Sequence, residues 1–167
     1  LLARFAKDRL REGVRVAGLI QHGHCHANTG LLVTSYPTGE VVRLSQRLGS
    51  GSTSCGLDAS KLLEASRSLR EGLANSELDL VILNRFGKLE QDGRGLRQEI
   101  IEAVAAEVPL LIAVPEIAFD SWLGFSGGMS VKLPCRRDAL ERWWRSVDAH
   151  SRRPTAAAPP TFCSECK

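Results

Sequence analysis

The stretch from Leu78 to Ala106, LDLVILNRFGKLEQDGRGLRQEIIEAVAA, most constrains what this chain can fold into, because its hydrophobic period changes midway. Its first part is an almost continuous apolar run, which is typical of a strand buried on both faces of a sheet. That run contains Leu78, Leu80, Val81, Ile82 and Leu83. From Leu96 onward, apolar residues recur at helical spacing. The pattern predicts a strand, a loop and a helix, which together form the repeating unit of an α/β protein.

Further segments follow the same alternation of strands and helices. Residues 2–10 read as a helix that stops at Gly13, and Val14 to Gln21 and Pro109 to Val114 read as strands. Two β-rich runs flank the turn sequence Pro37-Thr38-Gly39-Glu40, which indicates a β-hairpin. Strands that alternate with helices predict a mainly parallel sheet with right-handed crossovers.

Helices are also expected in the second half of the chain and before the central unit. Asp58 is predicted to cap a helix whose inward face carries Leu62, Leu63, Ala65, Leu69 and Leu73. Later segments predict a short aromatic helix, a short strand and a final helix, at Phe119 to Phe125, near Ser130 to Leu133, and at Arg136 to Ala149. We expect one α/β domain over residues 1–150, followed at 151–167 by a Pro/Ala-rich linker and a Cys-x-x-Cys tail.

Composition excludes several classes of partner. The net charge is only +3, the basic residues are scattered, and five Phe, one Tyr and three Trp offer little stacking surface, so no nucleic-acid partner is expected. No apolar run approaches the roughly 20 residues that span a bilayer, so no membrane partner is expected. Five cysteines in no disulfide-framework spacing, without a visible signal peptide, predict a cytoplasmic protein. Homo-oligomerisation is left open.

Within the central unit, ILNRFGKLE resembles a strand end of small P-loop nucleoside triphosphatases, in particular the archaeal and cancer-related NTPase group, whose version runs roughly V-I-D-E-I-G-K-M-E. Asn84 stands where that group has the Asp that holds Mg²⁺, and Arg85 stands where it has the Glu that polarises water. The resemblance implies nucleotide binding with Mg²⁺ as cofactor. The two replacements predict little or no hydrolysis.

Four longer blocks resemble, in the same order, a bacterial domain family of unknown function: RLSQRLGSGSTSCGLD, LVILNRFGKLEQDGRGLR, VPLLIAVPE and SWLGFSGGMSVKLP. That family is grouped with the P-loop nucleoside triphosphatases and is often encoded near molybdate-transport genes. The resemblance implies an α/β fold, a P-loop-NTPase-like three-layer sandwich with a mainly parallel sheet and an inserted β-hairpin. It also implies an accessory role in handling molybdate or a metal cofactor.

The phosphate-binding motif G-x-x-x-x-G-K-[ST] does not occur in the sequence. Two explanations have equal weight. The first strand and the phosphate loop precede Leu1, or the loop has degenerated to a form without lysine. We expect that the chain lacks its natural beginning, and a divergent member that starts at Leu1 is the alternative.

Two loops are candidates for holding a small phosphate or oxyanion ligand. The first combines cations, hydroxyls and flexible amides in Arg43, Ser45, Gln46, Arg47, Gly49 and Gly51. The second follows the central strand and offers Asn84, Arg85 and Lys88, with Glu90 as a candidate catalytic residue that places Mg²⁺ or water. In the structural alternative, the first loop is solvated, Asn84 ties the turn, Phe86 fills the core, and Lys88 and Glu90 are surface charges.

A metal site is the third candidate. His22-Gly-His-Cys-His places His22, His24 and His26 on one side of an extended chain, with Cys25 on the other, so three imidazoles could converge on zinc or another transition metal. Cys163 and Cys166 form half of a similar site in the tail. The alternatives are a His-rich polar loop and an oxidisable tail.

Three functions therefore remain open from the sequence. The first is a nucleotide- or oxyanion-binding protein with degenerate catalytic motifs. The second is an active nucleoside triphosphatase that uses Glu90. The third is a transition-metal-binding accessory protein that uses the histidine cluster.

Overall fold

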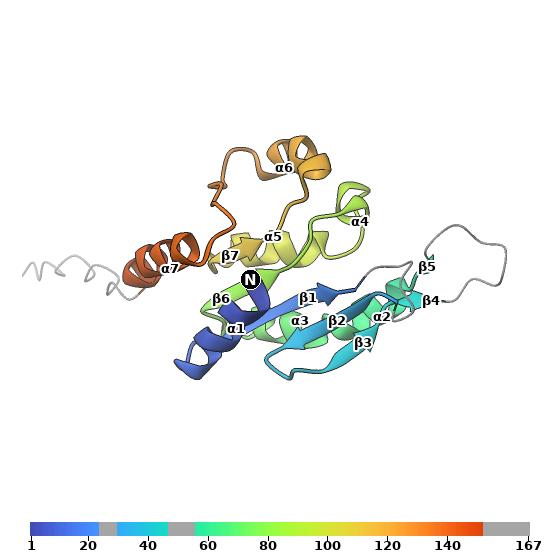
Figure 1. The fold of residues 1–167 in the computed structure, drawn as a ribbon, viewed down its shortest axis with the longest axis horizontal. Coiled ribbons are helices and arrows are strands. Elements are labelled where there is room, and N and C mark those ends of the chain that lie inside the picture. The colour runs from blue at the N-terminus through green and yellow to red at the C-terminus, as the bar shows by residue number, and fades with distance from the viewer. Residues whose placement is uncertain (24–29, 47–55, 152–167) are drawn as a thin grey trace, which may run out of the picture. The chain divides into compact units, whose positions relative to one another are not determined.

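The computed structural model describes residues 1–23, 30–46 and 56–151, in two compact units, Leu1–Lys132 and Leu133–Lys167. The first unit contains these elements in chain order (Figure 1): α1 (Leu2–Arg11), β1 (Val16–His22), β2 (Leu32–Tyr36), β3 (Val41–Arg43), β4 (Ser45–Gln46), β5 (Gly56–Leu57), α2 (Ala59–Ala65), α3 (Arg67–Ala74), β6 (Leu80–Leu83), α4 (Lys88–Gln91), α5 (Arg97–Ala105), β7 (Leu110–Ile112), the 3-10 turn η1 (Glu116–Ala118) and α6 (Phe119–Ser126). The second unit contributes α7 (Arg137–Ser151).

The first unit is built on a five-stranded sheet with the strand order β3-β2-β1-β6-β7. β1 and β6 are parallel, as are β6 and β7, whereas β2 is antiparallel to both of its neighbours. Only β2 therefore runs against the other strands of this sheet. The predicted α/β fold with a mainly parallel sheet is confirmed. β2 and β3 form the predicted hairpin around residues 37–40.

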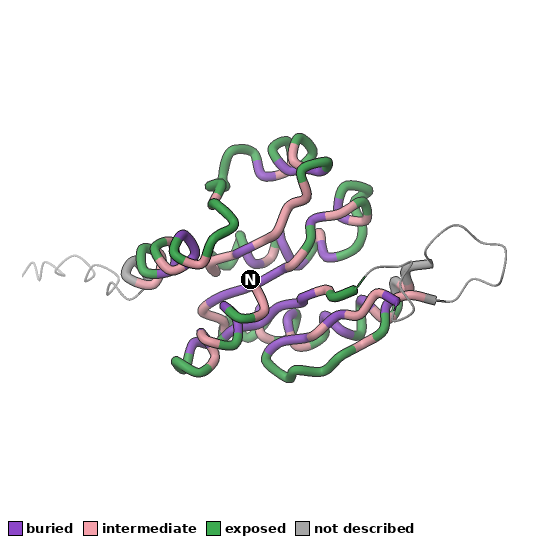
Figure 2. The backbone as a smooth tube through the Cα atoms, in the orientation of Figure 1, coloured by how far each residue is buried: buried purple, intermediate pink, exposed green. Residues whose placement is uncertain are grey.

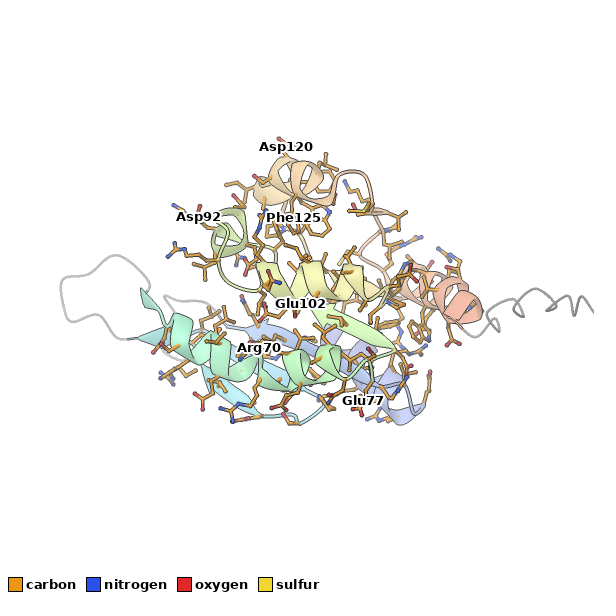
Figure 3. All side chains as sticks on the ribbon, turned by 180° about the vertical axis from the view of Figure 1, so that it is seen from behind. Arg70, Glu77, Asp92, Glu102, Asp120 and Phe125 are labelled. Atoms are coloured by element: carbon orange, nitrogen blue, oxygen red, sulfur yellow. The ribbon has the colours of Figure 1, made fainter. Side chains whose placement is uncertain are left out.

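Helices cover both faces of the sheet, which gives three layers. Along β1 and β6, Ala17, Leu19, Val81 and Leu83 belong to one core cluster with apolar side chains of α2, α3 and α5. These helices lie in front of the strands in Figure 3. Alternate strand residues point to opposite faces, and α1, whose Phe5 and Ala6 are fully buried, contacts β1 on the other face. Figure 2 shows the resulting buried band along the central strands.

The helix expected after Asp58 is divided into two. Its capping is as predicted, because Oδ1 of Asp58 accepts hydrogen bonds from the backbone N–H groups of Ser60 (3.0 Å) and Lys61 (3.2 Å). α2 and α3 meet at Ser66, whose hydroxyl donates to the carbonyl of Leu63 at 3.0 Å. The expected inward position of Leu63 is wrong, since its side chain is 54% exposed.

The short strand expected near Ser130 to Leu133 is also wrong, and Val131 is 72% exposed. The chain instead folds back onto α6. Gly127 and Gly128 both adopt positive φ and end that helix, which brings the Ser130 hydroxyl to the indole N–H of Trp122, 3.2 Å away. A strand needs a neighbouring backbone to pair with, and this segment is held by side-chain contacts to a helix.

The helix expected at 136–149 is present as α7. It carries ion pairs at helical spacing between Arg137 and Glu141 and between Asp138 and Arg142. Among residues 1–23, 30–46 and 56–151, no helix is long and apolar enough to cross a membrane.

Candidate functional site

The carboxyl ends of β1, β6 and β7 meet at one edge of the sheet, because the three strands are parallel and in register. The loop that follows β6 begins with backbone hydrogen bonds to β1 on one side and to the residue after β7 on the other. The N–H of Asn84 donates to the carbonyl of Leu19 at 3.0 Å, and the N–H of Phe86 donates to the carbonyl of Ala113 at 3.0 Å. Open α/β sheets bind ligands at this edge. The backbone therefore presents the second predicted loop where a ligand would be expected.

Asn84 has a structural partner at this edge. Its Nδ2 donates to the carbonyl of Gln21 at 2.7 Å, so the side chain joins the ends of β6 and β1. This contact agrees with the alternative interpretation from the sequence, in which Asn84 stabilises the turn rather than binding a ligand. Its Oδ1 remains an acceptor that a ligand or water can use.

Phe86 anchors the loop in the core and is fully buried. Its ring meets Trp122 edge-on, with centroids 5.2 Å apart, and stacks on Phe125 at 5.5 Å. The guanidinium of Arg97 lies over the Phe125 ring, 4.5 Å from its centroid. α6 thereby supplies an aromatic support for the loop, and Figure 3 shows Phe125 on the side of α6 that faces it.

Glu90 is buried, with 6% of its surface exposed, so the expectation of a surface charge is wrong. Its Oε2 accepts a hydrogen bond from the N–H of Gly87 at 2.8 Å, and its Oε1 accepts one from the N–H of Leu96 at 3.0 Å. Both carboxylate oxygens are thus engaged with backbone of the same loop. The catalytic role of Glu90 stays a prediction.

The cations of this loop lie on its outside. Arg85, Lys88 and Arg94 are exposed, and Arg97 is half-buried. The two acidic residues of the loop are Glu90, which is buried, and Asp92, whose carboxylate pairs with Arg94 at 3.6 Å. With four basic and two acidic residues, 84–97 has a net charge of +2. Its accessible surface favours an anion.

The first predicted loop begins at the same edge. His22 of β1, Leu32 of β2 and Arg43 of β3 lie side by side in register. Arg43 is exposed, and two strands, β2 and β1, separate its strand from β6. The hydroxyl of Ser45 already accepts the N–H of Leu31 at 3.1 Å. Gln46 belongs to β4. Arg47, Gly49 and Gly51 lie outside the described residues, so their role in binding stays a prediction.

The predicted metal site is described at one residue only. His22 is exposed at the end of β1, with Nε2 3.0 Å from Oγ1 of Thr34. The other predicted ligands lie outside the described residues: His24, Cys25, His26, Cys163 and Cys166. Within 1–23, 30–46 and 56–151, no three His, Cys, Asp or Glu side chains are grouped for a metal.

Sequence reasoning missed how the loop closes on Glu90. A signal was present, because Gly87-x-x-Glu90 has the spacing of a capping box, in which a Glu side chain reaches back to the first backbone N–H. The contact between Arg97 and Phe125 has no comparable signal, since the two residues belong to different elements.

The sequence of this chain is similar to those of known proteins. The family described as "Protein of unknown function (DUF2478)" matches residues 1–143. A protein of Bradyrhizobium diazoefficiens named "Molybdenum import ATP-binding protein ModC 2" is 39% identical over 156 residues. The matched region covers 92% of this chain but only 17% of that relative. No solved structure matches the chain.

Proposed function

Because the chain belongs to the DUF2478 family of proteins of unknown function, we propose its function from its own geometry and from its relative. The chain binds a small phosphate-bearing ligand, with a nucleotide as the leading candidate, at the carboxyl edge of its sheet. It hydrolyses that ligand slowly or not at all. It acts as an accessory in molybdate or metal-cofactor handling.

The observation that carries this proposal is the exposed cationic loop at the ends of the parallel strands. Arg85 and Lys88 follow β6 directly and are exposed, and the only carboxylate between Asn84 and Gln91 is buried and hydrogen-bonded. Cationic donors at a sheet edge match the charge and the hydrogen-bonding needs of a phosphate group. Arg43 lies at the same edge and extends the cationic surface toward β3.

Slow hydrolysis follows from the same residues. Phosphoryl transfer commonly needs a carboxylate to hold Mg²⁺ and a polar group to orient water. At the end of β6 those positions hold an amide, which is tied to Gln21, and a guanidinium. The proposal therefore separates binding from turnover. Mg²⁺ would reach this site with the nucleotide, held mainly by its phosphates.

The link to molybdate rests on the relative. The name of that relative assigns ATP binding and molybdenum import to it, and this chain matches only a minor part of its length. We propose that the chain contributes to the same process and that molybdate itself, a tetrahedral oxyanion, is a second ligand to test at the cationic loop.

Isothermal titration calorimetry of the full chain with ATP, ADP, phosphate and molybdate tests the proposal. The test variant is Arg85→Gln with Lys88→Gln. The control is Arg4→Gln with Lys7→Gln, which removes two exposed charges from α1, ahead of the amino end of β1. A charge-assisted hydrogen bond contributes about 1.5–3 kcal/mol. We therefore expect affinity to fall at least about tenfold in the test variant and to be unchanged in the control.

Two results would overturn the proposal. One is the absence of any calorimetric signal with these four ligands. The other is an equal loss of affinity in both charge variants, which would indicate nonspecific attraction by net charge. A phosphate-release assay addresses turnover, and a rate well above the buffer blank that depends on Glu90 would favour the active-enzyme alternative.

A further inference from the structure

We propose that Glu90 is a positioning residue that holds the two cationic halves of the ligand loop at a fixed spacing. The inference rests on the proposed function, because it assigns Glu90 a task at that same site. It replaces the expectation that the Glu90 carboxylate acts on Mg²⁺ or water. Glu90 acts instead through the backbone of the loop.

Three hydrogen bonds that Glu90 accepts join the start and the end of the loop. On the early side, Oε2 accepts the N–H of Gly87 at 2.8 Å. On the late side, Oε1 accepts the N–H of Leu96 at 3.0 Å, and the carbonyl oxygen of Glu90 accepts Nη1 of Arg97 at 3.3 Å. Glu90 thus connects Gly87, which lies next to Lys88, with Leu96 and Arg97 at the end of the loop.

The surroundings of the carboxylate support a fixed role. Glu90 is 6% exposed, so a ligand has little access to its oxygens. A Cβ atom on Gly95 would lie 2.2 Å from Oε1, and one on Gly87 would lie 3.4 Å from Oε2. Gly95 leaves room for the carboxylate only because it lacks a side chain, whereas a Cβ atom on Gly87 would be about at ordinary contact distance. A buried carboxylate that accepts two amide N–H groups is satisfied where it is and has little tendency to leave.

The late half of the loop is held a second time, from α6. The guanidinium of Arg97 lies over the Phe125 ring while its Nη1 donates to Glu90. Glu90 and Phe125 together restrict a long side chain that would otherwise sample many rotamers. A preorganised cation loses less entropy when it binds an anion, which increases affinity without an added contact.

The test compares Glu90→Ala with Gln91→Ala, which truncates the exposed neighbour on α4. We measure amide hydrogen exchange of residues 84–97 in the ligand-free protein and calorimetric affinity for ATP and inorganic phosphate. For Glu90→Ala we expect faster exchange at Gly87 and Leu96, unchanged protection in β1 and β6, and an affinity loss of at least about tenfold. Gln91→Ala should resemble the parent.

Glu90→Gln separates positioning from catalysis. The amide keeps one acceptor oxygen, so it can retain one of the two backbone bonds, and its affinity and exchange should lie between those of the parent and Glu90→Ala. A catalytic carboxylate would instead give parent-like binding in Glu90→Gln with loss of turnover, and that result would overturn the inference.

The remaining outcomes distinguish the two proposals. If the parent binds ATP or phosphate and Glu90→Ala binds equally well, the inference is wrong and the proposed function stands. If the parent binds none of the ligands, the proposed function is wrong, and faster exchange confined to 84–97 in Glu90→Ala would reduce Glu90 to a structural residue of the loop.

Discussion

Gly95 lies so close to Glu90 that a Cβ atom at residue 95 would stand 2.2 Å from Oε1 of the carboxylate. Gly95 also has a φ of 61°, in the left-handed region that favours glycine. Two independent constraints therefore act on one residue. Gly93, two residues earlier, has a φ of 79° but no atom within 4 Å of its Cβ position. Substitutions at Gly93 and Gly95 can therefore distinguish the cost of backbone strain from the cost of displacing Glu90.

We predict that Gly93→Ala lowers the free energy of unfolding by about 1–2 kcal/mol, the usual cost of a left-handed alanine. Gly95→Ala should cost about 1–3 kcal/mol more, because the methyl group displaces the carboxylate from the N–H of Leu96. Urea denaturation of both variants measures the difference. Equal losses would show that Glu90 is not held in this position.

Asn84→Asp should destabilise the protein rather than restore an acidic motif. Nδ2 of Asn84 donates to the carbonyl of Gln21, and an ionised carboxylate would place an acceptor against that acceptor. We expect a loss of about 1–3 kcal/mol at neutral pH. Because only the protonated acid can donate to Gln21, folding should raise the pKa of the new carboxyl group. The deficit should therefore shrink as pH falls through that raised pKa toward the unfolded value of about 4, below which it changes no further.

Urea denaturation of Asn84→Asp at neutral and acidic pH checks this, with the parent measured alongside to remove the pH dependence of other groups. Asn84→Ala is the matched control, since it loses the hydrogen bond without adding a charge. A substitution to Asp that leaves stability unchanged at neutral pH would contradict the tie between β6 and β1.

Tyr36 gives a pH prediction that can be followed directly, because it is the only tyrosine in the chain. Its side chain is buried, and burial raises the pKa of the phenol above its ordinary value of 10.0. The folded state thus favours the neutral phenol. As pH rises above 10, the unfolded chain releases its proton first, so stability should be complete below pH 10 and fall above it.

Near-ultraviolet absorbance titration of the native chain should show phenol ionisation at a higher pH than the same titration in concentrated urea. Tyr36→Phe should remove the absorbance change and that part of the alkaline loss of stability. Coincident titration curves in the folded and unfolded states would contradict the burial of the ring.

Asp58→Ala should lower the free energy of unfolding by about 1 kcal/mol, since Oδ1 of Asp58 satisfies two backbone N–H groups at the start of α2. Asp58→Asn should retain most of that stability, because the amide oxygen is also a good cap. Urea denaturation of the two variants measures the effect. An equal loss in both would point to the charge of Asp58 rather than to capping.

Hydrophobic periodicity in the sequence predicted most of the strands and helices of the fold. The apolar run of β6 predicted a strand buried on both faces, and all four of its residues are buried. Pro37 to Glu40 predicted the hairpin, and Asp58 predicted a helix start. These features are local, because a turn, a cap and an amphipathic period each depend on residues a few positions apart.

Predictions from the sequence failed where the structure of a segment depends on the elements that pack against it. Val131 has strand-like neighbours, yet Ser130 is held by Trp122 and the segment pairs with no strand. Leu63 was expected on the inward face, yet it is exposed, while Leu62 and Ala65 of the same helix are buried. Propensity and spacing describe what a segment can do, and tertiary contacts select among the possibilities.

The sequence by itself determined the α/β class and the presence of the exposed cations Arg85 and Lys88 after β6. Ligand binding at that edge of the sheet stays a prediction. Tertiary structure decided the environment of each polar group. Asn84 is tied to Gln21, 63 residues away in the chain, and the carboxylate of Glu90 is enclosed rather than exposed. The physical reason is that residue type fixes charge and hydrogen-bonding capacity, whereas burial and partners depend on segments that only folding brings together.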